Sequence, residues 1–88
     1  SHDEPEIIRR DDGSLLVDGQ CSFYEFLEYI DMECLYPEYD YNTISGLILH
    51  LLEHIPHTGE KISWHELEFE IVDMDGARID KILVYSKQ

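Results

Sequence analysis

The chain has 88 residues and carries 20 Asp and Glu against 6 Lys and Arg, which gives a net charge of -14. This length fits one small domain. The charge excludes nucleic acids as partners and disfavours anionic membrane surfaces, because both carry phosphate that an acidic surface repels. Basic partners and divalent cations are favoured instead. Apolar residues make up 43% of the chain, too many for a disordered acidic tail, so a folded core is expected.

Neither a membrane-spanning segment nor a signal peptide is predicted. The most apolar stretch, 44–52, is far shorter than the ~20 residues that a spanning helix needs. We therefore expect no direct membrane insertion by this chain. Cys21 and Cys34 form no CxxC pair and no metal-ligand set, which favours two reduced thiols in a cytoplasmic protein.

The first predicted element is a β-hairpin. Residues 1–6 are polar and contain a proline, so they are expected to form a linker or frayed end, and the domain itself is expected over 7–88. Residues 7–10 and 14–18 are strand candidates. Asp12-Gly13 between them predicts a two-residue turn.

Two helices follow. Ser22 and Glu25 have the capping-box spacing, and the apolar residues after Ser22 form one stripe that predicts a helix ending near 31–33. Residues 34–41 form an aromatic and acidic loop. Asn42 or Thr43 caps the second helix, whose stripe is Ile44, Leu47, Ile48, Leu51 and Ile55. Pro56 and Gly59 are expected to end it.

The rest of the chain predicts three strands. A short strand covers 61–64, alternation of apolar residues with Glu indicates a strand from 67, and a return strand covers 79–85. Together these elements predict a small α+β domain in the order ββ-α-α-βββ, with a mostly antiparallel sheet packed on two helices.

Charge predicts the register of the last hairpin. With Asp75-Gly76 as the turn, Asp73 faces Arg78. A turn at Gly76-Ala77 would instead place Asp73 opposite Asp80. Opposite charges across a ladder stabilise it and like charges destabilise it, so the first register is favoured.

Carboxylates at three connections are the candidate metal ligands. Mg²⁺ and Ca²⁺ prefer oxygen ligands, so each group is a candidate for weak binding of such a cation. The alternative is turn chemistry on a solvated acidic face. Residues 73–76 resemble the start of an EF-hand loop, but that loop's final Glu is missing. The candidates are Asp73, Asp75 and Asp80, Asp11 and Asp12, and Glu38 and Asp40.

The histidines and nucleophiles give weaker signals. His50 and His54 have the i, i+4 spacing that can share a zinc ion, but they are not part of an HExxH motif and also fit an exposed polar face. No Ser or Cys has the local signature of an activated nucleophile. No catalytic residues are therefore predicted, and the chain is not expected to be an enzyme.

The aromatic residues are numerous for a chain of this size. Packing beneath the Pro37 loop explains most of them, and a protein–protein contact is the alternative, because Tyr and Trp combine an apolar ring with a polar atom. The candidate interaction residues are Tyr36, Tyr39, Tyr41 and Trp64.

Four motifs resemble the CorC/HlyC transporter-associated domain. They cover most of the chain and occur in that family's order. The motifs are DGSLLVDG at 12–19, YDYNTISGLIL at 39–49, the turn of Ile55-Pro56 with Gly59-Glu60 and Trp64, and FEIVDMDG at 69–76 with RIDKILV at 78–84.

The chain departs from the family pattern at two places. Ser45 stands where the family commonly has Gly, and Glu53-His54 replaces a usual Gly-Arg. The second change removes a basic residue, so no binding role is carried over to that part of the helix surface.

The resemblance implies the setting of the domain. Such domains lie at the C-terminus of membrane proteins that also contain a membrane domain and a pair of CBS domains, and that are linked to magnesium and cobalt efflux and often named hemolysins. It implies a fold similar to part of a vanillyl-alcohol-oxidase-type FAD-binding domain, and a location on the cytoplasmic side of the membrane. The family has no established catalytic set.

Three functions are therefore considered. The first is a regulatory domain of a divalent-cation efflux protein that docks on the CBS domains, on the membrane domain or on a second copy, with weak cation binding at the acidic turns. The second is an interaction module without metal. The third is a nucleotide or flavin binder, which is disfavoured because the chain has no phosphate-binding glycine loop and no basic cluster.

Overall fold

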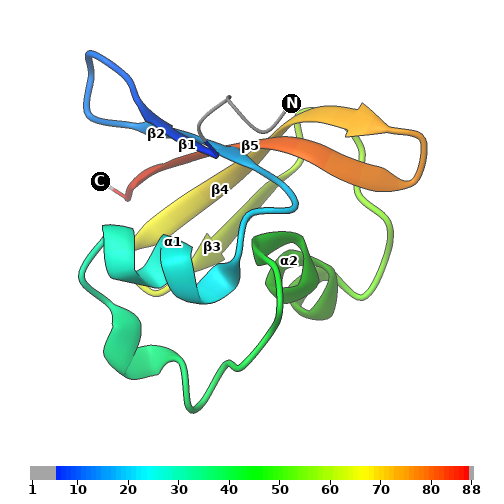
Figure 1. Cartoon of the computed structure of the whole chain (residues 1–88). Helices are drawn as coiled ribbons and strands as arrows, with labels where there is room; N and C mark the ends of the chain where they lie inside the picture. The colour runs from blue at the N-terminus through cyan, green and yellow to red at the C-terminus, as the bar shows by residue number, and fades with distance from the viewer. Residues whose placement is uncertain (1–5, 88) are drawn as a thin grey trace.

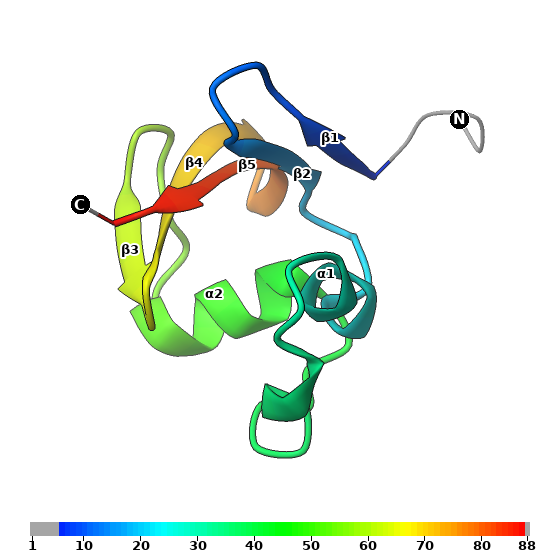
Figure 2. The ribbon, with the colours of Figure 1, turned by 90° about the vertical axis from the view of Figure 1, so that its left-hand side faces the viewer.

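A computed structural model describes residues 6–87. Five strands form one sheet in the order β1-β2-β5-β4-β3, and both α-helices lie on the same face of it (Figures 1 and 2). The predicted order ββ-α-α-βββ is confirmed, with an added 3₁₀ helix. The elements are β1 (Ile7–Arg9), β2 (Leu15–Asp18), α1 (Phe23–Tyr29), the 3₁₀ helix η1 (Glu33–Leu35), α2 (Ile44–Leu52), β3 (Lys61–Trp64), β4 (Leu67–Asp75) and β5 (Arg78–Ser86).

The domain boundary stays a prediction. The expected linker over 1–6 lies outside the described residues except for Glu6, which is exposed just before β1. Within 6–87, none of the helices has the length and apolar character that crossing a membrane requires.

The β1–β2 hairpin closes through a longer turn than predicted. Arg9 pairs with Leu15, and the Arg10 N–H donates to the Ser14 carbonyl at 2.8 Å. The loop is therefore 11–13, with Gly13 at a φ of +89°. Glycine adopts this left-handed conformation without a steric penalty, and hairpins of this length commonly place one there. The predicted two-residue turn at Asp12-Gly13 is wrong by one residue.

The register of the β4–β5 hairpin differs from the prediction. Asp75 pairs with Arg78, so the turn residues are Gly76-Ala77 and not Asp75-Gly76. Gly76 has a φ of +62°, whereas neither Asp75 nor Ala77 has a positive φ. Glycine at the first central position is the signature of a type II′ turn, whereas the predicted Asp-Gly turn requires a positive φ at both positions.

Irregularities in the ladder still place opposite charges across from each other. The pairing shifts between Ile71 and Asp73 and again between Asp73 and Met74, so Asp73 faces Lys81 instead of Asp80. The charge rule used for the prediction therefore holds, but β-bulges satisfy it rather than the position of the turn.

Helix α1 begins as predicted and ends earlier. The Ser22 side chain accepts a hydrogen bond from the Glu25 N–H at 3.2 Å, which is one half of the predicted capping box. The helix ends at Tyr29, and Asp31 has a φ of +60° that stops it before the expected end at 31–33.

Helix α2 is shorter than its apolar stripe. Thr43 caps it through a hydrogen bond from the Gly46 N–H at 3.2 Å. The helix ends at Leu52, where Glu53 takes a left-handed conformation, so Pro56 is not what ends it. The first half of the predicted stripe is buried, but Leu51 and Ile55 are exposed. The apolar pattern of the sequence therefore extends beyond the part of the helix that is buried against the core.

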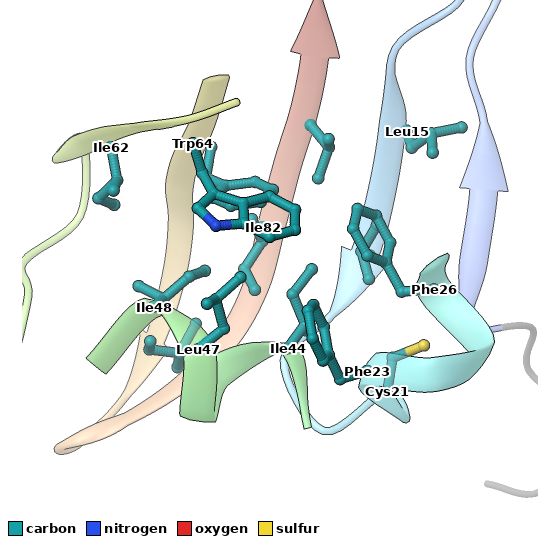
Figure 3. Close-up of a cluster of buried hydrophobic side chains, with 14 of the residues drawn as sticks. Leu15, Cys21, Phe23, Phe26, Ile44, Leu47, Ile48, Ile62, Trp64 and Ile82 are labelled. Carbon is teal, nitrogen blue, oxygen red and sulfur yellow. The ribbon is translucent and has the colours of Figure 1, made fainter. Parts of the chain in front are cut away.

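The core lies between the sheet and the helices (Figure 3). Side chains from α1, α2 and strands β2 to β5 form its buried part, and the half-buried Ile7 of β1 packs against them. The largest fully buried ones are Phe23, Phe26, Phe69, Leu27, Ile44, Leu47, Ile48, Ile71, Ile79 and Ile82.

The segment after β2 joins the two helices to the sheet. The Gly19 N–H donates to the Asp80 carbonyl at 2.9 Å, and the Gly19 carbonyl accepts from the Ser45 N–H at 3.2 Å. The Cys21 carbonyl accepts from the Ile44 N–H at 3.0 Å. This segment therefore satisfies two of the free backbone donors at the start of α2, the N–H groups of Ile44 and Ser45.

Candidate functional site

The candidate metal ligands of the β4–β5 hairpin lie near basic side chains. Asp75 Oδ2 is 3.7 Å from Arg78 Nη2, and Asp80 Oδ2 is 3.6 Å from Lys81 Nζ. Asp73 faces Lys81 across the ladder. These carboxylates therefore have a structural explanation as partners of basic side chains on the hairpin.

The candidates of the β1–β2 hairpin belong to its turn. Asp12 Oδ1 accepts hydrogen bonds from the Ser14 N–H at 2.9 Å and from the Ser14 hydroxyl at 2.6 Å. The hydroxyl bond is the largest cause that lowers the pKa of the Asp12 carboxyl from its ordinary value. Asp11 beside it is exposed.

The remaining candidates, Glu38 and Asp40, are exposed in the connection between η1 and α2. The seven candidates thus occupy three separate parts of the chain, which are the β1–β2 turn, the connection between η1 and α2, and the paired strands β4 and β5. Within residues 6–87, no group of three or more His, Cys, Asp or Glu side chains has an arrangement that could hold a metal ion. Weak divalent-cation binding by these acids stays a prediction.

The spacing of His50 and His54 allows a shared zinc ion, but the structure places His54 beside Glu60. His54 lies beyond the end of α2, so it does not share a helical face with His50. Its Nδ1 is 2.9 Å from the Leu52 carbonyl oxygen, and its Nε2 is 2.6 Å from Glu60 Oε2. Each ring nitrogen of His54 therefore faces an oxygen atom. The His57 N–H donates to Glu60 Oε1 at 3.2 Å.

Glu60 therefore accepts contacts from His54 and His57. The stability of the fold at low pH should depend on the ionisation of Glu60. Burial opposes its ionisation, but the hydrogen bonds from the His54 ring and the His57 N–H outweigh burial and lower the pKa of the carboxyl from its ordinary value of 4.5. A carboxyl whose pKa is lower in the folded state stabilises the fold above its unfolded pKa. That stability is lost as the pH falls through the folded pKa.

We expect Glu60→Gln to lower the melting temperature near neutral pH. The gap to the parent protein should be fully present above the ordinary pKa of 4.5 and should close as the pH falls through the lowered pKa of Glu60. Thermal unfolding followed by circular dichroism at a series of pH values measures the gap. Glu66→Gln, at an exposed carboxylate in the β3–β4 turn, is the control. A gap that does not change with pH would contradict the ion-pair explanation.

The four predicted interaction aromatics face the core. Trp64 is buried, and Tyr36, Tyr39 and Tyr41 are half-buried against the same cluster. The Trp64 ring lies 5.3 Å from the Tyr39 ring and 5.9 Å from the Phe23 ring, measured between centroids. Trp64 therefore cannot contact a partner unless the domain rearranges. A partner role for the three tyrosines stays a prediction.

The most exposed tyrosines are two others, Tyr24 and Tyr29, at 41% and 42%. Both lie on α1, off the stripe formed by Phe23, Phe26 and Leu27. This position was the signal in the sequence, because a side chain opposite the apolar stripe of a helix lies in solvent.

The two cysteines are free. Cys34 is exposed and Cys21 is buried. Burial, with help from the nearby Glu6 and Glu25 charges, raises the pKa of the Cys21 thiol to about 12. A thiol in this state is a poor nucleophile, because the thiolate is the reactive form.

A groove crosses the face of the sheet that the helices leave uncovered. It has a volume of about 810 Å³, and Glu68, Glu70, Lys61, Leu83 and Tyr85 contribute to its lining. Acidic, basic and apolar groups alternate there, so its charge does not favour one class of ligand.

The chain matches a known protein family along almost its whole length. The family model described as the transporter associated domain, CorC_HlyC, matches residues 8–88.

Two curated relatives are much longer proteins. A UPF0053 protein of Synechocystis sp. is 46% identical over 83 residues, which are 92% of this chain and 18% of the relative. The polyamine export protein of Haemophilus influenzae is 33% identical over 84 residues, which are 96% of this chain and 19% of the relative. The chain thus spans less than a fifth of the length of either.

Solved structures share the fold. A transporter associated domain from a Xylella fastidiosa hemolysin, in complex with Mg²⁺ and Mn²⁺, has a TM-score of 0.82 and 37% identity, covering 96% of this chain and 100% of the other. The transporter associated domain of a CBS domain protein from Porphyromonas gingivalis has a TM-score of 0.84 and 25% identity, covering 96% of this chain and 100% of the other. In both cases the solved chain is the domain alone.

Proposed function

Because the chain belongs to the transporter associated domain family, CorC_HlyC, we propose that it is a non-catalytic accessory domain of a membrane protein that exports cations. The match over residues 8–88 carries this proposal. The domain would lie on the cytoplasmic side of the membrane and regulate transport rather than form the transport path.

The exported cation would be multivalent. The family resemblance implies magnesium and cobalt, whereas one relative is named for polyamine export. A chain with a net charge of -14 attracts both kinds of cation. Support for a metal comes from the related Xylella domain, whose structure contains Mg²⁺ and Mn²⁺.

Regulation would act through docking. The domain would bind the CBS domains, the membrane domain or a second copy of itself, and cations would screen or bind its carboxylates and so shift the docked population. Support for the CBS domains as partners comes from the Porphyromonas relative, which belongs to a CBS domain protein. The alternative is docking in which cations play no part.

Removing the domain from the parent protein tests the proposal. Cells would carry the intact protein or a version truncated before this domain, and Mg²⁺ and spermidine contents would be measured at low and high external concentrations. We expect export to persist after truncation and its dependence on cellular cation content to change. Complete loss of export from a stably inserted protein, or unchanged regulation, would contradict an accessory role.

Titration of the isolated domain with Mg²⁺ distinguishes direct binding from screening. Backbone amide shifts at physiological ionic strength that saturate at one acidic connection, and that weaken in Asp73→Asn or Asp75→Asn, would support binding there. Diffuse amide shifts that do not saturate, and that are the same in the parent domain and in the Glu66→Gln variant, would support charge screening alone.

A further inference from the structure

The basic residues of this protein are confined to the sheet. All six Lys and Arg lie within strands or next to them, and none occurs between residues 11 and 60. The helical part of the molecule therefore has acidic side chains without basic ones beside them in the sequence. The basic residues are Arg9, Arg10, Lys61, Arg78, Lys81 and Lys87.

The solvent side of α1 combines these acids with aromatic rings. Tyr24, Glu25, Glu28 and Tyr29 are all exposed, while Phe23, Phe26 and Leu27 of the same helix are buried. These four residues are called the acidic tyrosine face below. Its four members are the exposed residues of α1, and Arg9 of the neighbouring strand β1 reaches one edge of the face at Tyr29.

The rings on this face are held in place and can receive a cation. The Tyr24 ring packs edge-on against Tyr36 with centroids 5.2 Å apart. The Arg9 guanidinium lies over the Tyr29 ring, 5.5 Å from its centroid. Arg9 reaches it from β1, so the protein itself contains an example of the contact that a basic side chain makes with this face.

We propose that the acidic tyrosine face docks a Lys- and Arg-bearing segment of the parent protein that lies outside this chain. Charge complementarity selects a basic partner, because Glu25 and Glu28 have no Lys or Arg on their own helix to neutralise them. Exposed tyrosines supply apolar contact area, as they do in protein interfaces. The inference rests on the proposed function, since more than four-fifths of the related full-length proteins lies beyond the matched region.

A second copy of this chain fits the face less well. Its basic residues are interspersed with Glu66, Glu68, Glu70, Asp73, Asp75 and Asp80 on the same strands and turns. Two copies, each with a net charge of -14, also repel each other. Self-association is therefore an outcome to be tested and not the proposal.

Photo-crosslinking in the full-length parent protein tests the assignment. Benzoylphenylalanine would replace Tyr24 in one variant and Ser63, in the edge strand β3 and exposed, in another. We expect the Tyr24 probe to form an adduct with a Lys- or Arg-bearing segment of the same protein, identified by mass spectrometry. Adding Glu25→Gln and Glu28→Gln should reduce the adduct about fivefold, the effect of two exposed ion pairs.

The matched control removes the same charge elsewhere. Glu66→Gln with Glu68→Gln, in and beside β4, should leave the Tyr24 adduct unchanged. An adduct between two copies of this domain, or one that resists Glu25→Gln with Glu28→Gln, would overturn the proposed partner. Adducts from Ser63 alone would overturn the assigned face while supporting docking. The absence of adducts from both probes would count against docking itself, and therefore against the proposed function.

Discussion

Replacing Gly19 with alanine is expected to destabilise the fold strongly. A Cβ at this position would lie 2.1 Å from the Ile79 carbonyl oxygen and 2.8 Å from its carbonyl carbon. Both atoms belong to the backbone of β5, so no side-chain rotation can relieve the contact. Gly19 also donates to Asp80 and accepts from Ser45, so a shift of its backbone would disturb the start of α2.

The expected cost of Gly19→Ala is at least ~3 kcal/mol, the upper range for overpacked interiors. Small domains have a free energy of unfolding of only ~5–10 kcal/mol. Thermal unfolding by circular dichroism and the amide spectrum would measure the loss. A melting temperature within a few degrees of the parent would contradict the close approach of Gly19 to β5.

Gly46→Ala is the matched control for Gly19→Ala. A Cβ there would meet Thr43 Oγ1 at 3.6 Å and Tyr41 Cβ at 3.7 Å, which are ordinary contacts. Gly46 lies inside α2, where alanine is favoured over glycine by ~0.5–1 kcal/mol. The same change at two glycines should therefore have opposite signs.

Local patterns predicted the elements of this fold well. The stripe that includes Phe23, Phe26 and Leu27 predicted α1, and the alternation of Glu with apolar residues predicted β4. The apolar period of an element shows which of its faces is buried. It does not show which residues form the turn between two strands. A period of two cannot distinguish registers that differ by two residues, because both place the same side chains inside.

The register of β4–β5 depended on information that the pattern does not contain. The predicted and observed pairings differ by two positions, because Arg78 faces Asp75 rather than Asp73. The turn preference of Gly76 decided the register, and the local irregularity moved only Asp73, which faces Lys81. Charge pairing gave a correct rule, that Asp73 avoids Asp80, but a bulge allowed another way to obey it.

The candidate site was less predictable than the fold. Counting aromatics identified a surplus but not which rings face solvent. Trp64 was assigned to a surface and lies in the core, whereas Tyr24 and Tyr29 are exposed. The stripe of α1 contained this information. The connection that carries Tyr36 and Tyr39 has no regular period, so the burial of these rings follows only from their packing, on α1 for Tyr36 and on β3 for Tyr39.

The second large loss of stability is expected for a substitution of Phe23, an aromatic residue of the core. Its ring is fully buried and lies 6.4 Å from Tyr36, 6.3 Å from Tyr41 and 5.9 Å from Trp64 between centroids. The Phe23 ring thus packs α1 against β3 and against the segment between α1 and α2 that carries Tyr36 and Tyr41. Phe23→Ala is expected to lower the free energy of unfolding by ~3–5 kcal/mol, because it removes this burial and leaves a cavity.

Two substitutions separate this explanation from a general sensitivity of α1. Phe23→Leu keeps most of the volume and should cost less than about 1.5 kcal/mol. Tyr24→Ala, at the neighbouring exposed position, should change stability by no more than about 0.5–1 kcal/mol. Urea unfolding followed by the fluorescence of Trp64, the only tryptophan of the chain, reports all three. Equal losses for Phe23→Ala and Tyr24→Ala would mean that Tyr24 is part of the core, and would remove the acidic tyrosine face as an open docking surface.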